Sequence, residues 1–500
     1  MASARPRVAV VGAGPSGLYA AAALAASGEA VDVDVLDRLP APYGLVRYGV
    51  APDHVKMKSV IRVLAQPFGP GEVRFLGDVR VGKGGIPLPE LREHYTAVVH
   101  ATGCAVDRRL GIPGEDLPGS IGSGVIVGWY CGHPDHGAPP LLDAPGVAVV
   151  GAGNVALDVS RVLARTPEEL SSTDVPDTVL DALRGSAVRD VHVLIRRGPQ
   201  HVKFTPVELR QLNDLADAEV VVHDDGLLAA GVPDEVTDRR ERHNLEILTG
   251  WAHAASRNGT RPGRRIHLRF LRSPVRILGT DRVTGVVVER TALTPEGGVI
   301  GTGEEETLDV GLVVRAVGYT AEPITDLPFD ARTGTVPNEA GRVVEDGAPV
   351  SGEYVTGWIR RGPTGVIGTN KHDAVETVAA LLNDLPALPP PAHPDPDDLA
   401  RALAAHGIRP VDWTAWLRLD AEEIRLGRGR GAERVKVAEL DAMLAAVHGP
   451  ADRSDADRSG DEQGSDQRGS TATTVGTSRS LSANSGVSVD VSDTVQVTEP

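Results

Sequence analysis

The chain has 500 residues and a formal net charge of −17 at pH 7, which leaves room for two or three domains and argues against general nucleic-acid binding, a function that needs a basic surface. Aromatic residues make up 3% of the chain, which also argues against a base-stacking platform. The two cysteines, Cys104 and Cys131, are too far apart for a CxxC redox disulfide and too few for a four-thiolate iron–sulfur cluster.

The N-terminus leads directly into the first predicted strand, which begins at Val8. Residues 1–7 contain no apolar signal segment and are too short for a transit peptide. No apolar run reaches the ~20 residues that are needed to cross a membrane. We therefore expect a cytoplasmic protein with no membrane attachment.

The first predicted strand, residues 8–11, runs into the glycine-rich turn GAGPSG, which begins at Gly12 and opens an alanine-rich helix. Glycine lets the main chain approach a ligand closely, so backbone N–H groups and the helix N-terminus can bind a pyrophosphate there. The next strand, residues 31–36, ends at Asp37, about 20 residues beyond the turn. A carboxylate at that position can accept hydrogen bonds from ribose hydroxyls; the alternative is a solvated residue at a strand end.

A second turn of this kind, GAGNVA, begins at Gly151 after a strand over residues 147–150. The strand that follows, residues 191–195, ends in Arg196 and Arg197 rather than in an acid. Paired guanidinium groups suit the 2′-phosphate of NADP, although two neighbouring arginines can also be a solvated surface pair. Two such turns in separate α/β segments predict two dinucleotides in one protein, an arrangement that moves electrons between cofactors.

Residues 239–276 reverse the charge balance of this acidic chain, because ten arginines stand there against two glutamates. Such a local basic field can steer an acidic partner. Arginines scattered over a solvated loop and strand would give the same count. The residue pattern alone leaves both interpretations open.

The chain then returns to the first unit through an apolar strand, residues 312–318, that ends in glycine. A glycine cluster over residues 362–368 precedes an apolar helix over residues 374–382. We interpret this pattern as another strand–turn–helix end near a cofactor ring, with Trp358 beside it; the alternative for Trp358 is an ordinary core aromatic.

A proline-rich connection over residues 386–396 leads to a predicted helical segment over residues 397–448. Beyond Gly449 the sequence is dominated by Ser, Thr, Gly, Asp and Gln and loses its periodicity. Such a segment cannot bury enough apolar surface to order itself. The sequence therefore predicts a disordered acidic tail over residues 451–500.

Several longer motifs give the chain a resemblance to a known family. It closely resembles the adrenodoxin-reductase family of ferredoxin–NADP⁺ reductases, and its bacterial members most, over residues 5–447. The motifs that carry the resemblance are YGLVRYGVAPDH from Tyr43, VGWY from Val127, GAGNVALD from Gly151, RRGP from Arg196 and RGPTGVI from Arg361.

The resemblance implies an α/β fold with two Rossmann-like dinucleotide-binding domains. An NADP-binding domain, residues 106–324, would be inserted into an FAD-binding domain made of residues 1–105 and 325–450. It also implies FAD and NADP as cofactors, an acidic ferredoxin as partner, and electron transfer from NADPH through FAD to that ferredoxin. We expect a monomer that binds neither nucleic acid nor membrane.

Site residues follow from the resemblance, position by position. The implied FAD contacts are Gly12, Gly14, Ser16, Asp37, Leu45, Val81, Trp358, Gly365, Val366 and Ile367. The implied NADP contacts are Ala152, Gly153, Asn154, Val155, Arg196, Arg197, Glu208 and Gly365. The implied docking residues for an acidic iron–sulfur partner are Arg210, Arg239, Arg240 and Arg242. His54 is the candidate catalytic residue, for proton handling or nicotinamide positioning, because imidazole titrates near neutral pH.

Two positions depart from the family pattern. Many relatives have Glu where this chain has Asp37, a shorter carboxylate that still accepts two hydrogen bonds. Relatives often have Glu at position 211, where the family assigns a role with the histidine near the flavin; Gln211 cannot exchange a proton, which puts that part of the mechanism in doubt.

Three other functions compete with this reading. A two-cofactor disulfide reductase would need a cysteine pair, and the electron-input subunit of a glutamate synthase would need cysteine-ligated clusters; this chain has only two cysteines. A non-enzymatic redox sensor would bind the nucleotides without steady turnover.

Overall fold

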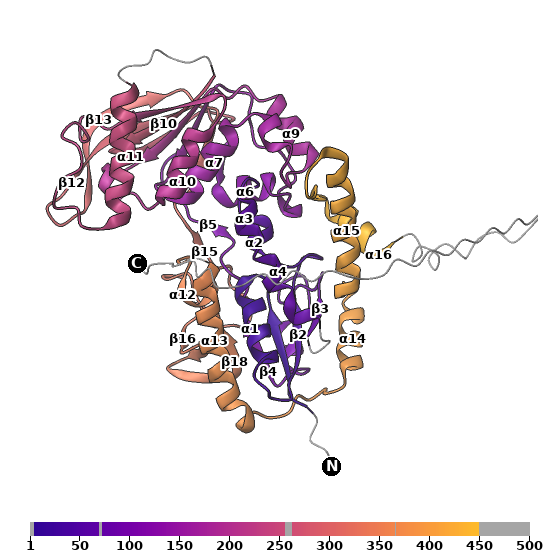
Figure 1. The fold of residues 1–500 in the computed structure, drawn as a ribbon. Helices are drawn as coiled ribbons and strands as arrows, with labels where there is room; N and C mark the ends of the chain where they lie inside the picture. The colour runs from indigo at the N-terminus through magenta and orange to yellow at the C-terminus, as the bar shows by residue number, and fades with distance from the viewer. Residues whose placement is uncertain (1–4, 70–72, 256–262, 366, 450–500) are drawn as a thin grey trace, which may run out of the picture. The chain divides into compact units, whose positions relative to one another are not determined.

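Two parallel sheets carry the two glycine-rich turns in the computed structural model, which describes residues 5–69, 73–255, 263–365 and 367–449 (Figure 1). The first sheet has seven strands in the order β16-β17-β18-β4-β1-β2-β3, parallel from β18 to β3, with β17 and β16 added antiparallel. Its strands are β1 (Arg7–Val11), β2 (Asp32–Leu36), β3 (Val73–Leu76), β4 (Ala97–His100), β16 (Asn338–Glu339), β17 (Arg342–Glu345) and β18 (Ala348–Val355).

The second sheet has six parallel strands in the order β6-β14-β7-β8-β10-β9. Its strands are β6 (Ser120–Gly122), β7 (Gly146–Val150), β8 (Asp190–Ile195), β9 (Ala218–His223), β10 (Arg264–Phe270) and β14 (Leu312–Arg315). An antiparallel three-stranded sheet accompanies it, made of β11 (Arg272–Leu278), β12 (Gly285–Leu293) and β13 (Val299–Leu308).

One α/β unit is inserted into the other, as predicted. All strands of the second sheet lie between β4 and β16 in the chain. The chain passes between the sheets through β5 (Val106–Asp107) and β15 (Tyr319–Thr320), which pair antiparallel. We call the unit of the seven-stranded sheet the outer unit and that of the six-stranded sheet the inserted unit. The predicted boundaries at residues 105 and 324 fall close to this strand pair, and the predicted tail lies outside the described residues.

Helices cover both sheets (Figure 1). Those of the outer unit are α1 (Pro15–Ala25), α2 (Leu45–Tyr48), α3 (Val55–Lys58), α4 (Ile61–Leu64), α5 (Leu88–Arg92), α12 (Trp358–Arg361), α13 (Ile367–Asp384), α14 (Pro396–Ala405), α15 (Trp413–Arg430) and α16 (Leu440–His448). Those of the inserted unit are α6 (Ser123–Tyr130), α7 (Asn154–Ala164), α8 (Pro167–Leu170), α9 (Asp177–Arg184), α10 (Pro206–Gln211) and α11 (Arg239–Ala255). Short 3₁₀ helices lie at Gln66–Phe68, Pro134–His136, Pro199–His201, Leu212–Asp214 and Leu385–Ala387.

The centre of each sheet is buried because its central strand, β1 or β7, is a nearly continuous run of aliphatic residues. All five residues of β1 and all five of β7 are buried. Both faces of a parallel sheet must be covered, and such runs satisfy that requirement. The glycine turn and its helix then follow at the carboxyl end of each central strand, where open α/β sheets bind their ligands.

α13 is longer than the predicted helix over residues 374–382, because it begins at Ile367. Its first turns carry the buried polar residues Asn370 and Asp373 instead of apolar ones, so the hydrophobic pattern begins later than the helix. Asn370 accepts hydrogen bonds from Ser16 and Arg361, which explains why a polar residue is buried there.

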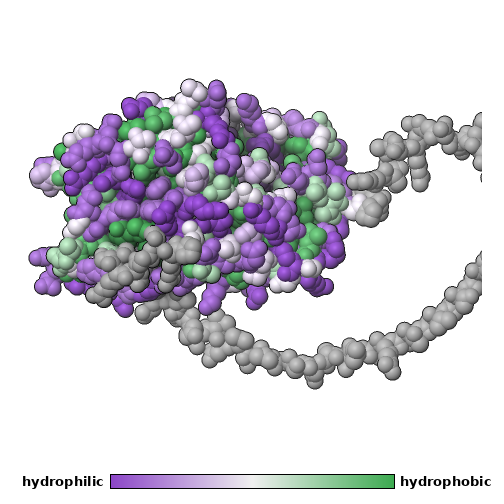
Figure 2. Space-filling view, turned by 90° about the horizontal axis from the view of Figure 1, so that it is seen from above, coloured by the Kyte–Doolittle hydropathy of each residue, from purple (hydrophilic) through white to green (hydrophobic). Residues whose placement is uncertain are grey.

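Hydrophilic side chains cover most of the face shown in Figure 2, with hydrophobic side chains in small groups between them. Within the described residues, no helix is both long and apolar enough to cross a membrane.

Candidate functional site

The first glycine turn is held by the carboxylate at the end of the next strand. Gly12 has φ +110°, and a Cβ there would lie 2.5 Å from the carbonyl oxygen of Ala101, so only glycine fits. The N–H group of Ala13 donates to Asp37 Oδ2 over 2.7 Å, and that of Leu39 donates to Asp37 Oδ1 over 2.9 Å. Burial raises the pKa of Asp37, while these two hydrogen bonds lower it. Both oxygens keep a lone pair for further donors.

The segment Tyr43–Tyr48 lies against this turn. The N–H group of Tyr43 donates to the carbonyl oxygen of Ala13 over 2.8 Å. A Cβ on Gly44 would lie 2.8 Å from the Cα of Gly14, so the two backbones meet closely. Leu45, a predicted FAD contact, follows directly and is 43% exposed, a large value for a leucine.

The remaining predicted FAD contacts lie in three other parts of the outer unit. Ser16 donates to Asn370 over 3.0 Å, and a Cβ on Gly357 would lie 2.0 Å from Ser16 Oγ, which places Trp358 next to α1. Ile367 is the first residue of α13, and Gly365 lies two residues before it. Val81 follows β3 and lies near Asp37, since the N–H of Val79 donates to the Asp37 carbonyl. Val366 lies outside the described residues.

The second glycine turn is joined to the loop that follows the arginine pair. A Cβ on Gly151 would lie 2.3 Å from the carbonyl oxygen of Ala316. The Ala152 carbonyl accepts from the N–H of Lys203 over 2.8 Å, and Asn154 Oδ1 accepts from the N–H of Thr205 over 2.9 Å. These bonds hold the loop beside the N-terminus of α7, where Asn154 and Val155 begin the helix.

A ligand has room at this turn. A Cβ on Gly153, the N-cap of α7, would meet no other atom within 4 Å. Arg196 is exposed, and its neighbour Arg197 has a buried Nε that lacks a hydrogen-bond partner among the described residues. Both follow β8, the strand beside β7, so two guanidinium groups lie near an open helix N-terminus.

Between the two units lies a polar cluster around His54. His54 Nε2 lies 3.0 Å from Asp158 Oδ1 and 3.2 Å from Glu208 Oε2. Asp158 belongs to α7 and Glu208 to α10, whereas His54 belongs to the outer unit. Arg161 of α7 donates to the Asp53 carboxylate over 2.6 and 3.0 Å, and Arg165 forms an ion pair with Asp53 at 3.2 Å.

The carboxylates determine the protonation of His54. Burial is the largest single effect and lowers its pKa, but hydrogen bonds to Asp158 and Glu208 outweigh it and raise the pKa of His54 to about 9. The Arg161 guanidinium beside Asp53 in turn lowers the pKa of that carboxyl to about 2, against the effect of burial. His54 is therefore mainly protonated at neutral pH.

Three ligand atoms of the cluster, one each from His54, Asp158 and Glu208, lie within 4.8 Å of one another, which is a donor set that metals also use. Arg161 Nη2, however, lies 2.9 Å from His54 Nε2 and 2.8 Å from Asp158 Oδ1. The guanidinium thus takes the place that a cation would need, and we interpret the cluster as an ion-pair network.

The structure changes the interpretation of Gln211. The carboxylates that face His54 are Glu208 and Asp158, so the proton partner of His54 does not depend on position 211. Glu208, predicted as an NADP contact, lies in this cluster between the units. Asp158 and Arg161 were missed by the sequence reasoning. Their signal is a charged pair three residues apart in a helix that is otherwise almost wholly buried, and Arg161 is 0% exposed.

The predicted basic field has less net positive charge than its number of arginines suggests, because several of them form ion pairs. Arg265 pairs with Asp190 at 2.7 Å, and Arg269 and Arg272 pair with Glu306 at 3.2 and 2.9 Å. The acids come from other strands, which is why counting within residues 239–276 overestimated the field. Arg257 and Arg261 lie outside the described residues.

The four predicted docking arginines divide into two groups. Arg210 on α10 and Arg239 and Arg240 on the neighbouring α11 are exposed. Arg242 instead donates to the carbonyl oxygen of Val236 over 2.8 Å, so part of its role is to hold the loop before α11.

Comparison with known proteins agrees with this architecture. The sequence model of a family described as pyridine nucleotide-disulphide oxidoreductase matches residues 6–198. The chain is 42% identical over 457 residues to the NADPH-ferredoxin reductase FprA of Mycobacterium tuberculosis, and the aligned region covers 87% of this chain and 98% of that relative. It is 40% identical over 461 residues to the mitochondrial NADPH:adrenodoxin oxidoreductase of Homo sapiens, with 88% and 91% covered.

A solved structure of Mycobacterium tuberculosis FprA in complex with NADPH superposes with a TM-score of 0.83 and 41% identity, covering 89% of this chain and all of that one. Identity of 40–42% over most of both chains, together with the same fold, is far beyond what a shared nucleotide-binding motif would give. The chain belongs to the family of NADPH-ferredoxin and NADPH:adrenodoxin reductases.

Proposed function

We propose that this protein is an FAD-dependent oxidoreductase that moves electrons from NADPH through FAD to a ferredoxin-type iron–sulfur protein. One observation carries the proposal: two dinucleotide-binding turns lie on two separate parallel sheets, and the units of these sheets contact each other through the His54 cluster. Relatives over nearly the whole chain are named for this activity.

The residues of the outer unit fit FAD. The N-terminus of α1 has no side-chain cap, so its N–H groups are available for a pyrophosphate. Asp37 lies where a ribose would need an acceptor. The hydroxyl of Thr356 is fully buried at the end of β18 and has no hydrogen-bond partner among the described residues, which a flavin at this edge could supply.

The residues of the inserted unit fit NADP. No atom crowds the position of a Cβ at Gly153, which suits the close approach of a pyrophosphate, and the unpartnered Arg197 Nε, with Arg196, would provide donors for a 2′-phosphate. An acid at the end of the second strand would select NAD instead.

When bound, FAD supplies the step between a two-electron donor and a one-electron acceptor. The protein's own part is to position the two cofactors and to hold the His54 imidazole between the two units. The raised pKa of His54 makes it a charged donor at neutral pH rather than a general base.

The partner surface that we propose is the exposed arginine group Arg210, Arg239 and Arg240. Exposed guanidinium groups on two adjacent helices favour an acidic ferredoxin, whose approach they would accelerate. We propose that the protein works as a monomer.

Steady-state turnover tests the proposal against a nucleotide-binding sensor. Purified protein with about one FAD per chain is expected to reduce ferricyanide with NADPH and to reduce an iron–sulfur partner from the same organism. Protein that binds both nucleotides but does not turn over would favour the sensor.

A further inference from the structure

The segment Tyr43–Tyr48, which contains the proposed FAD contact Leu45 and which we call the FAD-contact segment, lies between two neighbours. One side faces the first glycine turn, through the hydrogen bond between Tyr43 and Ala13 and the close approach of Gly44 to Gly14. The other side faces residues 413–437, which comprise α15 and the loop after it. We call residues 413–437 the C-terminal clasp.

Two aromatic contacts and one buried ion pair join the segment Tyr43–Tyr48 to the clasp. The Arg47 guanidinium donates to Glu423 of α15, with Nη1 3.0 Å from Oε2. The side chain of Arg47 is 3% exposed and that of Glu423 is 0% exposed. The ring of Trp416 lies 5.1 Å from the Arg47 guanidinium and packs edge-on against Tyr43.

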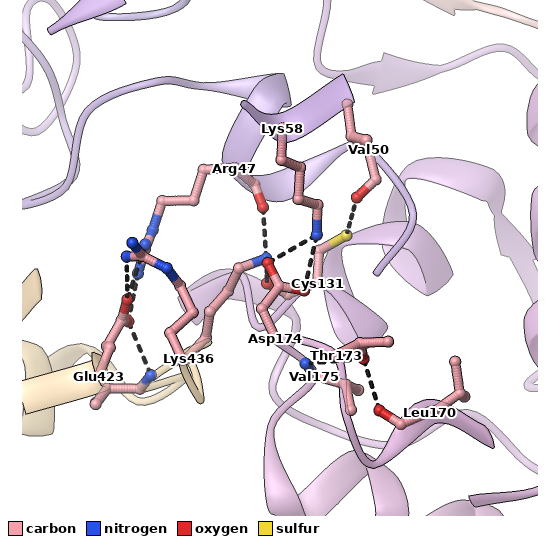
Figure 3. Close-up of polar contacts among 12 residues, drawn as sticks. Arg47, Val50, Lys58, Cys131, Leu170, Thr173, Asp174, Val175, Glu423 and Lys436 are labelled. Atoms are coloured by element: carbon pink, nitrogen blue, oxygen red, sulfur yellow. Dashed lines mark hydrogen bonds and ion pairs between the residues drawn. The ribbon is translucent and has the colours of Figure 1, made fainter. Parts of the chain in front are cut away.

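Lys436 extends this contact from the FAD-contact segment to the inserted unit (Figure 3). Its buried Nζ donates to the carbonyl oxygen of Arg47 over 2.6 Å and to that of Cys131 over 3.0 Å. It also lies 3.1 Å from Asp174, which accepts two hydrogen bonds of 2.7 Å from Lys58. One ammonium group therefore joins α2, the end of α6 and the segment between α8 and α9.

Burial of this ammonium does not by itself stabilise the fold. Burial lowers the pKa of Lys436, with smaller contributions from Lys58 and Arg47; Asp174 and Cys131 oppose them, and the resulting pKa is about 8. A lowered lysine pKa means that folding disfavours the charged form at neutral pH. Because this buried charge adds little stability, we attribute its presence to the groups that it holds in position.

We propose that Glu423 and Lys436 are positioning residues, which hold the segment Tyr43–Tyr48 against the first glycine turn and so fix the geometry of the FAD-binding site. This inference rests on the proposed function, because it takes the segment to contact FAD. The C-terminal helices thereby act on cofactor binding from a distance, although they follow both nucleotide turns in the chain.

Substitutions in the full-length, FAD-loaded protein test this role. Lys436→Met removes the donor to the Arg47 carbonyl but leaves Asp174 paired with Lys58. Glu423→Gln removes the charge opposite Arg47. Glu422→Gln is the matched control, because Glu422 is the preceding residue of α15 and forms only an exposed pair with Arg425 among the contacts described.

The primary readout is the rate of FAD release after dilution, followed by the rise in free-flavin fluorescence. We expect Lys436→Met to release FAD about tenfold faster, which corresponds to about 1.4 kcal/mol, with an altered visible circular dichroism of the bound flavin. Its melting temperature without FAD should fall by only a few degrees: the carbonyl oxygens of Arg47 and Cys131 lose a donor, but Asp174 stays paired with Lys58. Glu423→Gln should release FAD at least as fast, and Glu422→Gln should match the wild type.

FAD release at the wild-type rate from both clasp variants would overturn the proposal. The proposal would also be overturned if Lys436→Met lowered the melting temperature to the same extent as it lowered FAD retention, since that result would indicate a merely structural role. A wild type that keeps FAD but cannot be reduced by NADPH would contradict the proposed function alone, and the release comparison would still decide the role of the clasp. A wild type that binds no FAD would refute both.

Discussion

We propose that two residues near the second glycine turn, Arg196 and Arg197, decide which coenzyme the protein uses. The turn itself would accept the pyrophosphate of NADH or NADPH, because its N–H groups do not reach the 2′-position. Discrimination then rests on Arg196 and Arg197, for which the described residues offer no acidic partner. The pair is predictable from the sequence, since it follows a strand directly, but the unpartnered buried Nε is visible only in the fold.

Replacing both Arg196 and Arg197 by Ala should weaken NADPH binding strongly and leave NADH binding nearly unchanged. Loss of one charge-assisted bond costs ~1.5–3 kcal/mol, on the order of 10- to 100-fold in binding. Dissociation constants for both coenzymes check this, with Arg276→Ala, at an exposed arginine on β11, as the control. Equal losses for NADH and NADPH would mean that the pair supports the fold rather than the phosphate.

His54 should make the stability of the protein depend on alkaline pH. Its folded pKa of about 9 lies above the ordinary value of 6.5, so its contribution is complete below pH 6.5 and disappears as the pH rises through 9. We expect wild type to exceed His54→Gln in unfolding free energy by on the order of 1–2 kcal/mol near pH 6, because solvent screening and the neighbouring Arg161 reduce the full effect of the pKa shift, and the gap to close above pH 9. Denaturant midpoints measured across this range check it; a gap that does not change with pH would contradict the raised pKa.

At the scale of elements, the sequence predicts what is local and misses what is paired across the chain. The strand–turn–helix units at Gly12 and Gly151 were predictable because all their residues are contiguous. The His54 cluster was not, because its ion pairs join residues about 100 positions apart and no periodicity marks such pairing. The same limit explains the overestimated basic field, whose neutralising acids lie on other strands.

The exposed arginines of α11 should matter for the protein partner and not for the small-molecule acceptor. Reversing the charge at Arg239 and Arg240 to Glu should slow ferredoxin reduction roughly tenfold at low salt and leave NADPH-to-ferricyanide activity unchanged. The difference from wild type should shrink as salt rises, because ions screen the field. Arg184→Glu on α9, also exposed, is the control. Equal losses in both assays would place the docking surface elsewhere.

At the scale of the whole molecule, the two glycine-rich turns belong to one protein unit because the chain inserts one α/β unit into the other and contacts between the units hold them in place. The insertion was predictable from the family resemblance, and the order of the strands confirms it. Arg161 and Lys436, which make contacts between the units, are buried cations. No pattern in the neighbouring sequence marks them as buried. Their roles depend on the acids that the fold brings to them.

Removing residues 451–500 should leave FAD content and ferricyanide turnover unchanged, because this segment is polar, aperiodic and poor in large apolar residues. Its acidic side chains could compete for the docking arginines, so truncation is expected to speed ferredoxin turnover at low salt and to have no effect at high salt. Loss of flavin, or a large drop in melting temperature, would show that the segment is an ordered part of the protein.

Anaerobic titration of the purified, FAD-loaded protein with NADPH tests the central claim most directly. We predict that about one equivalent of NADPH bleaches the visible absorbance of the bound flavin, that NADH does so far less readily, and that an oxidised ferredoxin then restores the absorbance while becoming reduced. Flavin that stays oxidised in excess NADPH, or reduced flavin that passes no electrons to any ferredoxin of the organism, would contradict the account.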